Sequence, residues 1–268
     1  MEILVCIKQV ADDSVNVGLN PQTGLPAIED VTKVVNAFDT YAQEMAVRFK
    51  EAYGGSVTVI SVGDDAVRES LKNCLAVGAD QARQVYDSAF EGSDAAGVAS
   101  ALCAAIHALE TEKGAPFDVI FFGRESTDYA SGQVGTLVAE KLNRALITSV
   151  IDVEADGAAL KVKKETEEGY CLLSAQTPAV LTVNKPDYEP RYATIKSKLA
   201  ARKAAIPAMG TAELGTLDMQ SVGSAAAGEL VAALREPAKR AAGHMLREET
   251  KEETVRKLMD ELRDAGVL

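Results

Sequence analysis

The sequence predicts an α/β protein with an open, mostly parallel sheet and flanking helices, followed by a C-terminal arm that carries a further helix. Residues 3–7, 57–62 and 119–122 are short apolar runs with β-branched or aromatic side chains, as strands buried on both faces require. Amphipathic helical patterns lie between these runs. Because strand–helix alternation implies parallel strands joined by right-handed crossovers, we expect the first half of the chain to form an open sheet.

Four amphipathic stripes in the first half predict helices. Asn36 and Asp39 precede the first stripe and Asp94 precedes the third, and all three are residue types that cap helix N-termini. Gly78 follows the second stripe, at a place where glycine commonly ends a helix. The four stripes lie at residues 42–49, 67–75, 98–109 and 134–142.

In the second half the pattern changes to β segments joined by short polar turns. Residues 207–215 are irregular, and residues 223–228 are rich in small side chains and indicate a linker. Residues 248–262 form a charged amphipathic pattern that predicts a terminal helix. We therefore expect one domain at residues 1–207, with a linker and arm at residues 208–268. The β segments lie at residues 146–153, 160–164, 170–175 and 179–183.

Composition limits the partners and the compartment. The 268 residues carry a formal net charge of −12, which argues against nucleic acid or an anionic membrane as the main partner. No apolar stretch is long enough to span a bilayer, and the N-terminus lacks the basic start of a signal peptide. Cys6, Cys74, Cys103 and Cys171 are far apart in apolar contexts, so we expect reduced thiols, no metal site and a cytoplasmic location.

Three segments leave predicted strands at the edge where open parallel sheets bind ligands, the carboxyl ends of the strands. They are residues 6–10, 62–65 and 123–135, and the last one leads into a helix. Glycines and hydroxyls at a helix N-terminus offer free N–H groups and a positive dipole end, which suit a phosphate or pyrophosphate. The loop matches neither the Rossmann nor the Walker pattern, so an ordinary strand–helix turn is the alternative.

A basic segment contrasts with the acidic composition of the chain. Residues 185–203 contain Pro186 and Pro190, which favour an exposed, extended turn, and then a short helical pattern. Ile195 and Leu199 would form a small apolar spot ringed by Lys and Arg. Complementary charge around an apolar contact is typical of a docking site for an acidic partner, and a solvated basic face is the alternative.

These segments resemble motifs of the beta subunits of electron transfer flavoproteins, in the correct order over residues 1–207. Residues 123–135 resemble the nucleotide-phosphate loop of the family. Residues 36–39 resemble the motif that wraps the adenosine, although Ala37 stands where the family usually has proline. Residues 184–203 resemble the partner-recognition loop. The matching residues of the phosphate loop include Gly123, Asp128, Gln133 and Gly135.

The resemblance implies a Rossmann-like fold of the adenine-nucleotide alpha-hydrolase type, with a nucleotide site. The nucleotide would be FAD, which accepts hydride from NADH in flavin-based electron bifurcation, or a structural AMP in the non-bifurcating group. Phe38 would pack towards the flavin of the alpha subunit or, alternatively, form a hydrophobic staple on the following helix. The implied cofactor-binding residues are Cys6, Asn36, Ala37, Phe38, Asp39, Val62, Gly123, Arg124, Glu125, Ser126, Thr127, Asp128, Ser131, Gly132, Gln133 and Val134.

The resemblance also implies two protein partners, an electron transfer flavoprotein alpha subunit and a flavin dehydrogenase of the acyl-CoA or another type. Ile195 would anchor the dehydrogenase, with Arg191, Lys196 and Lys198 as a charged rim. The C-terminal arm would contact the alpha subunit.

No catalytic residue is expected. His107 and His244 have neither a nucleophile nor an acid nearby in the sequence, so each is read as an ordinary surface or core histidine. A stand-alone ATP- or AMP-binding domain of the stress type is the alternative function. Such a domain would need neither the basic loop nor the trailing helix.

Overall fold

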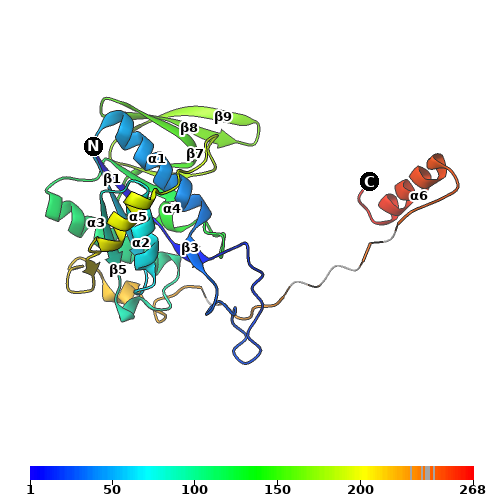
Figure 1. The fold of residues 1–268 in the computed structure, drawn as a ribbon, viewed down its shortest axis with the longest axis horizontal. Coiled ribbons are helices and arrows are strands. Elements are labelled where there is room, and N and C mark those ends of the chain that lie inside the picture. The colour runs from blue at the N-terminus through cyan, green and yellow to red at the C-terminus, as the bar shows by residue number, and fades with distance from the viewer. Residues whose placement is uncertain (230, 237, 239–241, 244) are drawn as a thin grey trace.

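The computed structural model describes the whole chain except residues 230, 237, 239–241 and 244, so His244 lies outside the described residues. In spatial order the strands of the main sheet are β11 (Ala208–Met209), β5 (Gln81–Val85), β4 (Ser56–Val62), β1 (Glu2–Cys6), β6 (Val119–Gly123), β10 (Ala179–Val183), β7 (Ala145–Asp156), β8 (Ala159–Thr166) and β9 (Gly169–Gln176). Neighbouring strands from β11 to β7 are parallel, whereas β7, β8 and β9 form an antiparallel extension. Within the described residues this sheet has nine strands and confirms the predicted open, mostly parallel arrangement (Figure 1).

Helices cover both faces of the sheet and give the domain three layers (Figure 1). The helices are α1 (Ala37–Tyr53), α2 (Val67–Ala76), α3 (Ala95–Lys113), α4 (Val134–Lys141), α5 (Ile195–Lys203) and α6 (Lys251–Asp264), with short 3-10 turns at η1 (Ser88–Phe90) and η2 (Met219–Ser221). Ile3 and Val5 of β1 pack with α1 and α2, and α5 rests on α2. Leu4 and Cys6 pack on the other face with α3 and α4. Because β1 is buried from both sides, its core positions are apolar.

The end of α2 and the start of α3 lie next to the residues that the sequence indicated as helix boundaries. Asp94 caps α3, because its side chain accepts a hydrogen bond from the Gly97 N–H at 2.9 Å. Gly78 follows α2 with a φ of +121°, and a Cβ atom there would lie 2.8 Å from Cγ1 of Val47 on α1. Both the backbone conformation and the close approach of α2 to α1 therefore require glycine.

Several short strands were not predicted. β5 contains Gln81, Arg83 and Gln84 and so lacks the apolar run of the other inner strands. Its buried polar groups are satisfied inside the fold: Gln84 donates to the Gly63 carbonyl at 3.0 Å and accepts from Arg68 at 2.8 Å. β2 (Gln9–Ala11) and β3 (Lys33–Val35) form a small antiparallel sheet and are too short to show a period in the sequence.

Part of the expected linker is held against the domain. The N–H of Gly223 donates to Oγ of Ser93, and the N–H of Gly228 donates to Oδ2 of Asp94, each at 2.7 Å. The segment predicted as a linker at residues 223–228 is therefore attached to the domain, because the residues that open α3 supply acceptors for it.

α6 confirms the predicted terminal helix, displaced by a few residues towards the C-terminus. Thr250 and Glu253 form a capping box at its start. None of its residues is buried, and Val255, Leu258 and Met259 expose apolar side chains. Figure 1 shows α6 apart from the sheet. No helix in the described part of the chain is long and apolar enough to cross a membrane.

Candidate functional site

The carboxyl ends of β4, β1 and β6 meet at one edge of the sheet. The three strands are neighbours and parallel, with β1 in the middle. After β1 the chain proceeds to β4 and β5 on one side and then crosses to β6 on the other, so the strand order reverses at β1. Such a reversal creates the crevice in which open α/β sheets bind ligands. The structure thus brings the three predicted loop segments to one place.

Asn36 connects the start of α1 to the β6–α4 loop, which we define as residues 124–133. Its Nδ2 donates to the Glu125 carbonyl at 2.8 Å, and its Oδ1 accepts from the Thr127 N–H at 3.0 Å. Asn36 is 1% exposed and occupies the N-cap position, but its side chain makes no capping bond. The prediction that it caps α1 is therefore wrong. An amide offers a donor and an acceptor together, so one side chain satisfies a carbonyl and an N–H of the loop.

Asp39 joins the ends of β1 and β6. Its Oδ2 accepts from the Lys8 N–H at 2.7 Å, and its Oδ1 accepts from the Gly123 N–H at 2.9 Å. Burial raises the pKa of Asp39 to about 7, although hydrogen bonds from Lys8, Asn36 and Gly123 favour the ionised form. No side chain fits at position 123, because its Cβ would lie 2.3 Å from Oδ1 of Asp39. Asp39 thus binds strand ends and, contrary to the prediction, does not cap α1.

Lys8 brings positive charge to the β6–α4 loop and was not singled out from the sequence. Its Nζ lies 2.6 Å from Oδ2 of Asp128, 3.5 Å from Oγ of Ser126 and 4.7 Å from the ring centre of Tyr129. Partial burial favours protonation of Asp128, but the hydrogen bonds from Lys8, Ser126 and Tyr129 and the charge of Lys8 together outweigh it and lower the pKa of Asp128. The sequence signal that could have identified Lys8 as a site residue is its position, since it stands just after β1 at the edge where ligands bind.

α4 begins at the same edge without a side-chain cap. The N–H groups of its first turn, at Val134, Gly135 and Thr136, therefore lack acceptors within the helix. Gly135 lets the helix start close to the sheet, because a Cβ there would lie 2.9 Å from Cγ2 of Thr182 and 3.1 Å from Cγ of Phe122. Free N–H groups, the helix dipole and the nearby Lys8 ammonium together fit a nucleotide phosphate.

The other predicted cofactor residues surround this point, but not all present side chains to it. Cys6 is 4% exposed, and burial raises the pKa of its thiol well above the usual value, so only its backbone is available to a ligand. The guanidinium of Arg124 lies 5.0 Å from the ring centre of Phe38 and pairs with Glu125 at 2.5 Å. The half-buried residues are Phe38, Val62, Gly123, Arg124, Glu125, Ser126 and Val134, and the exposed ones are Ala37, Thr127, Asp128, Ser131, Gly132 and Gln133.

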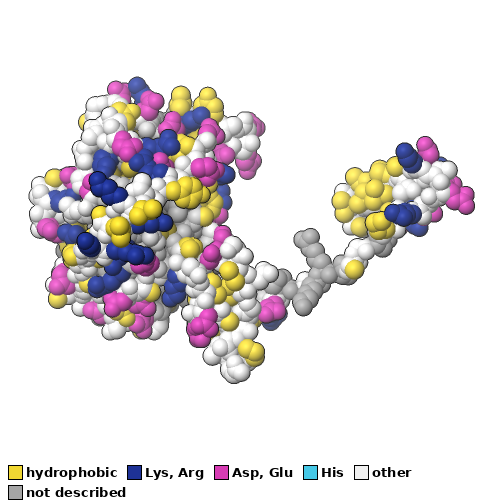
Figure 2. Space-filling view, viewed as in Figure 1, with side chains coloured by type: hydrophobic (Ala, Val, Ile, Leu, Met, Phe, Trp, Pro, Cys, Tyr) yellow, Lys and Arg dark blue, Asp and Glu magenta, His cyan; other side chains and the backbone are white. Residues whose placement is uncertain are grey.

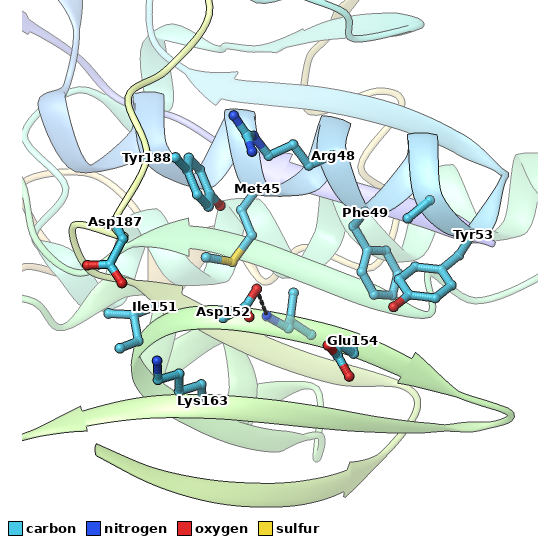
Figure 3. A pocket seen from close by; sticks show the side chains of 12 residues that line it. Met45, Arg48, Phe49, Tyr53, Ile151, Asp152, Glu154, Lys163, Asp187 and Tyr188 are labelled. Atoms are coloured by element: carbon cyan, nitrogen blue, oxygen red, sulfur yellow. Dashed lines mark hydrogen bonds between the residues drawn. The ribbon is translucent and has the colours of Figure 1, made fainter. Parts of the chain in front are cut away.

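A separate cleft of about 350 Å³ lies between α1 and the strands β7 and β8 (Figure 3). Met45, Phe49 and Ile151 contribute its apolar lining, and Arg48 and Tyr188 lie beside each other at its rim. None of the predicted cofactor residues lines this cleft. It is therefore distinct from the edge at which the strand ends meet.

The predicted docking residues divide into two groups. Ile195 is 82% exposed at the start of α5, and Lys196 and Lys198 are exposed beside it. Figure 2 shows Lys and Arg side chains gathered around small apolar spots over the region of α2 and α5. Arg191 differs, since its side chain is 33% exposed and forms ion pairs with Glu44 and Glu51 on α1. No group of His, Cys, Asp and Glu among the described residues could hold a metal ion.

Comparisons with known proteins show the family of the chain. Residues 25–214 match the electron transfer flavoprotein domain family. The chain is 35% identical over 268 residues, 100% of both chains, to an electron transfer flavoprotein subunit beta of Thermoanaerobacterium thermosaccharolyticum. It is 34% identical over 251 residues, 93% of this chain and 92% of the relative, to the same subunit of Megasphaera elsdenii. It is 30% identical over 269 residues, 100% of both chains, to caffeyl-CoA reductase–Etf complex subunit CarD of Acetobacterium woodii.

The family match spans more than half of the chain, and two relatives align with it from end to end. The chain therefore belongs to the beta subunits of the electron transfer flavoprotein family, which pair with alpha subunits.

Proposed function

We propose that this chain binds an adenine nucleotide at the carboxyl edge of its sheet and works in a heterodimer with an electron transfer flavoprotein alpha subunit. In this proposal the nucleotide is FAD, which accepts hydride from NADH in flavin-based electron bifurcation, while the chain braces the alpha-subunit flavin and docks a flavin dehydrogenase. When bound, FAD supplies a ring that can take hydride from a nicotinamide. The chain itself contributes binding, orientation and docking.

The observation that carries the proposal is the construction of the sheet edge. Asn36 and Asp39 fix the β6–α4 loop and the ends of β1 and β6 through four hydrogen bonds of 2.7 to 3.0 Å. That arrangement leaves the first N–H groups of α4 directed at the same edge, where they can hold a phosphate. Lys8 can stabilise negative charge there, although in the structure its ammonium is paired with Asp128.

The choice of FAD over AMP rests on the residues of the loop, and the class of dehydrogenase is suggested by one relative. Gln133, Val134 and Gly135 resemble the FAD-binding group of the family. The relative from Acetobacterium woodii is named as part of a caffeyl-CoA reductase–Etf complex, so a partner that acts on acyl-CoA compounds is a reasonable candidate for this chain. A cytoplasmic location belongs to the same proposal and is supported by four free cysteines.

The test is the cofactor content of the purified heterodimer. Acid extraction followed by chromatography should yield a second FAD per heterodimer, and NADH should reduce it under anaerobic conditions. One FAD together with one AMP would instead assign the chain to the non-bifurcating group. A heterodimer with no adenine nucleotide beyond the FAD of the alpha subunit would contradict the proposed site.

A further inference from the structure

The segment that presents Ile195 has no regular secondary structure of its own. It leaves β10 and runs irregularly through residues 184–194 before α5 begins. Such segments are mobile unless tertiary contacts hold them. The contacts that hold this one come mainly from α1, and they are charged.

Glu44 of α1 is the centre of these contacts. Its side chain is 3% exposed, and its Oε2 accepts hydrogen bonds from the backbone N–H of Arg191 at 3.1 Å and from Nε at 2.8 Å. The other oxygen, Oε1, accepts from Nη2 of Arg191 at 3.2 Å and from Nε of Arg48 at 2.7 Å. Burial raises the pKa of Glu44, but the hydrogen bonds from Arg191 and Arg48 outweigh it, so the pKa is lowered.

Two further contacts complete the attachment. Glu51, about two turns further along α1, accepts from Nη1 and Nη2 of Arg191 at 2.6 and 2.9 Å. Arg48 lies between these two carboxylates along the helix and stacks over the ring of Tyr188, with 4.0 Å from Cζ to the ring centre. Figure 3 shows Arg48 and Tyr188 together above the cleft. We call Glu44, Glu51 and Arg191 the Arg191 clamp.

We propose that the Arg191 clamp positions the docking residue Ile195, so that Glu44 and Arg191 are positioning residues for partner recognition. The inference rests on the proposed docking function. The chain between Arg191 and Ile195 spans at most about 14 Å even when fully extended, so fixing Arg191 confines Ile195 to a small volume. An anchor that is already confined loses less conformational freedom when the partner binds.

This assignment changes the role expected for Arg191. A charged residue at the rim of a docking site attracts an acidic partner through the solvent. The charge of Arg191 is instead balanced by two carboxylates of its own chain. Lys196 and Lys198 remain exposed and can form the rim. Removal of Glu44 would leave Arg191 without its buried partner and attached to α1 only through the more exposed Glu51.

The test compares Glu44→Gln with a matched control in the intact heterodimer. The control is Glu110→Gln, which also breaks an Arg–Glu pair of low exposure: Nη2 of Arg144 lies 2.6 Å from Oε1 of Glu110, with exposures of 8% and 13%. Glu110 belongs to α3, on the other face of the sheet. Both variants remove one charge of the same type, but only Glu44→Gln loosens the attachment of the docking segment.

The first readout is hydrogen exchange at residues 187–195, which needs no partner. Exchange should rise at least about tenfold at the Arg191 amide in Glu44→Gln, since that N–H donates to Glu44 and opening the clamp exposes it, and should stay unchanged in Glu110→Gln. Unchanged exchange in Glu44→Gln would overturn the inference whatever the docking data show.

The second readout is electron transfer to a purified short-chain acyl-CoA dehydrogenase with its acyl-CoA substrate. Glu44→Gln should raise the KM for the dehydrogenase about tenfold with kcat changed less than about twofold, as for loss of docking alone. Combined with Ile195→Ala it should add little further loss, because residues that act through one another are not additive. An equal rise in the KM for the dehydrogenase in Glu44→Gln and Glu110→Gln would overturn the inference. So would a rise in KM in the double variant that equals the full sum of the effects of Glu44→Gln and Ile195→Ala. If the wild-type heterodimer transfers no electrons, the proposed docking function fails as well, and the exchange readout then judges the clamp separately.

Discussion

Replacement of Gly123 by alanine should disrupt the nucleotide site through one steric contact. The added Cβ would lie 2.3 Å from Oδ1 of Asp39 and 2.8 Å from both the backbone N of Asp39 and the carbonyl carbon of Phe38. Two of these three atoms belong to the backbone of α1, so no side-chain rotation can relieve the overlap. The end of β6 must therefore move away from α1, and the hydrogen bond between the Gly123 N–H and Asp39 breaks.

The size of the effect follows from two terms. Overpacking in a close-packed site costs about 1–3 kcal/mol, and loss of a buried hydrogen bond adds about 1 kcal/mol. A total of about 2–4 kcal/mol should lower the Tm by roughly 5–15 °C for a domain of this size. The nucleotide content of the purified heterodimer should fall in parallel, because the β6–α4 loop continues directly from Gly123.

The assay is thermal unfolding of the heterodimer together with nucleotide quantification. Gly215→Ala is the matched control, since no atom lies within 4 Å of a Cβ at that position and its φ is not positive. That variant should retain both the wild-type Tm and the nucleotide. A Gly123→Ala heterodimer with unchanged Tm and full nucleotide content would refute the reasoning.

Three further predictions concern Asp39, the docking residue and the arm. Burial raises the pKa of Asp39 to about 7. The contribution of this carboxyl group to the free energy of unfolding is therefore complete below about pH 4 and is lost as the pH rises to about 7. In urea unfolding, the wild type should therefore lose about 2–3 kcal/mol relative to Asp39→Asn between pH 5 and pH 8, and a pH-independent difference would contradict this. Ile195→Ala should weaken docking by about 2 kcal/mol. Because Ile195 is 82% exposed, the Tm and the nucleotide content should stay unchanged. A lower Tm with normal docking would contradict its role as an anchor. Removal of residues 245–268 should weaken heterodimer formation, measured by dilution in analytical ultracentrifugation, because α6 exposes an apolar stripe; unchanged affinity would count against this role.

The inner strands and most helices could be predicted because their signals are local. The run at β1 is apolar since both faces are covered, and Asp94 precedes α3 where a capping residue belongs. β5 escaped detection because its burial depends on two hydrogen bonds of Gln84, one donated to the Gly63 carbonyl and one accepted from Arg68, which no short window of sequence reveals.

The candidate site shows the same limit. Asn36 and Asp39 were identified by residue type, but they were assigned to capping because the helix after them is the local feature. Their actual partners, Glu125 and Gly123, are 89 and 84 residues away in the sequence. Arg191 is paired with Glu44 across 147 residues, so its charge could not be recognised as neutralised before the fold was known.

The most direct test of the account is an experimental structure of the heterodimer with its native nucleotide. The account predicts that the phosphates lie at the N–H groups of Val134, Gly135 and Thr136, between the ends of β1 and β6. It also predicts that Asn36 and Asp39 keep their bonds to the β6–α4 loop and the strand ends. A nucleotide bound elsewhere, such as in the cleft between α1 and β7, would contradict it.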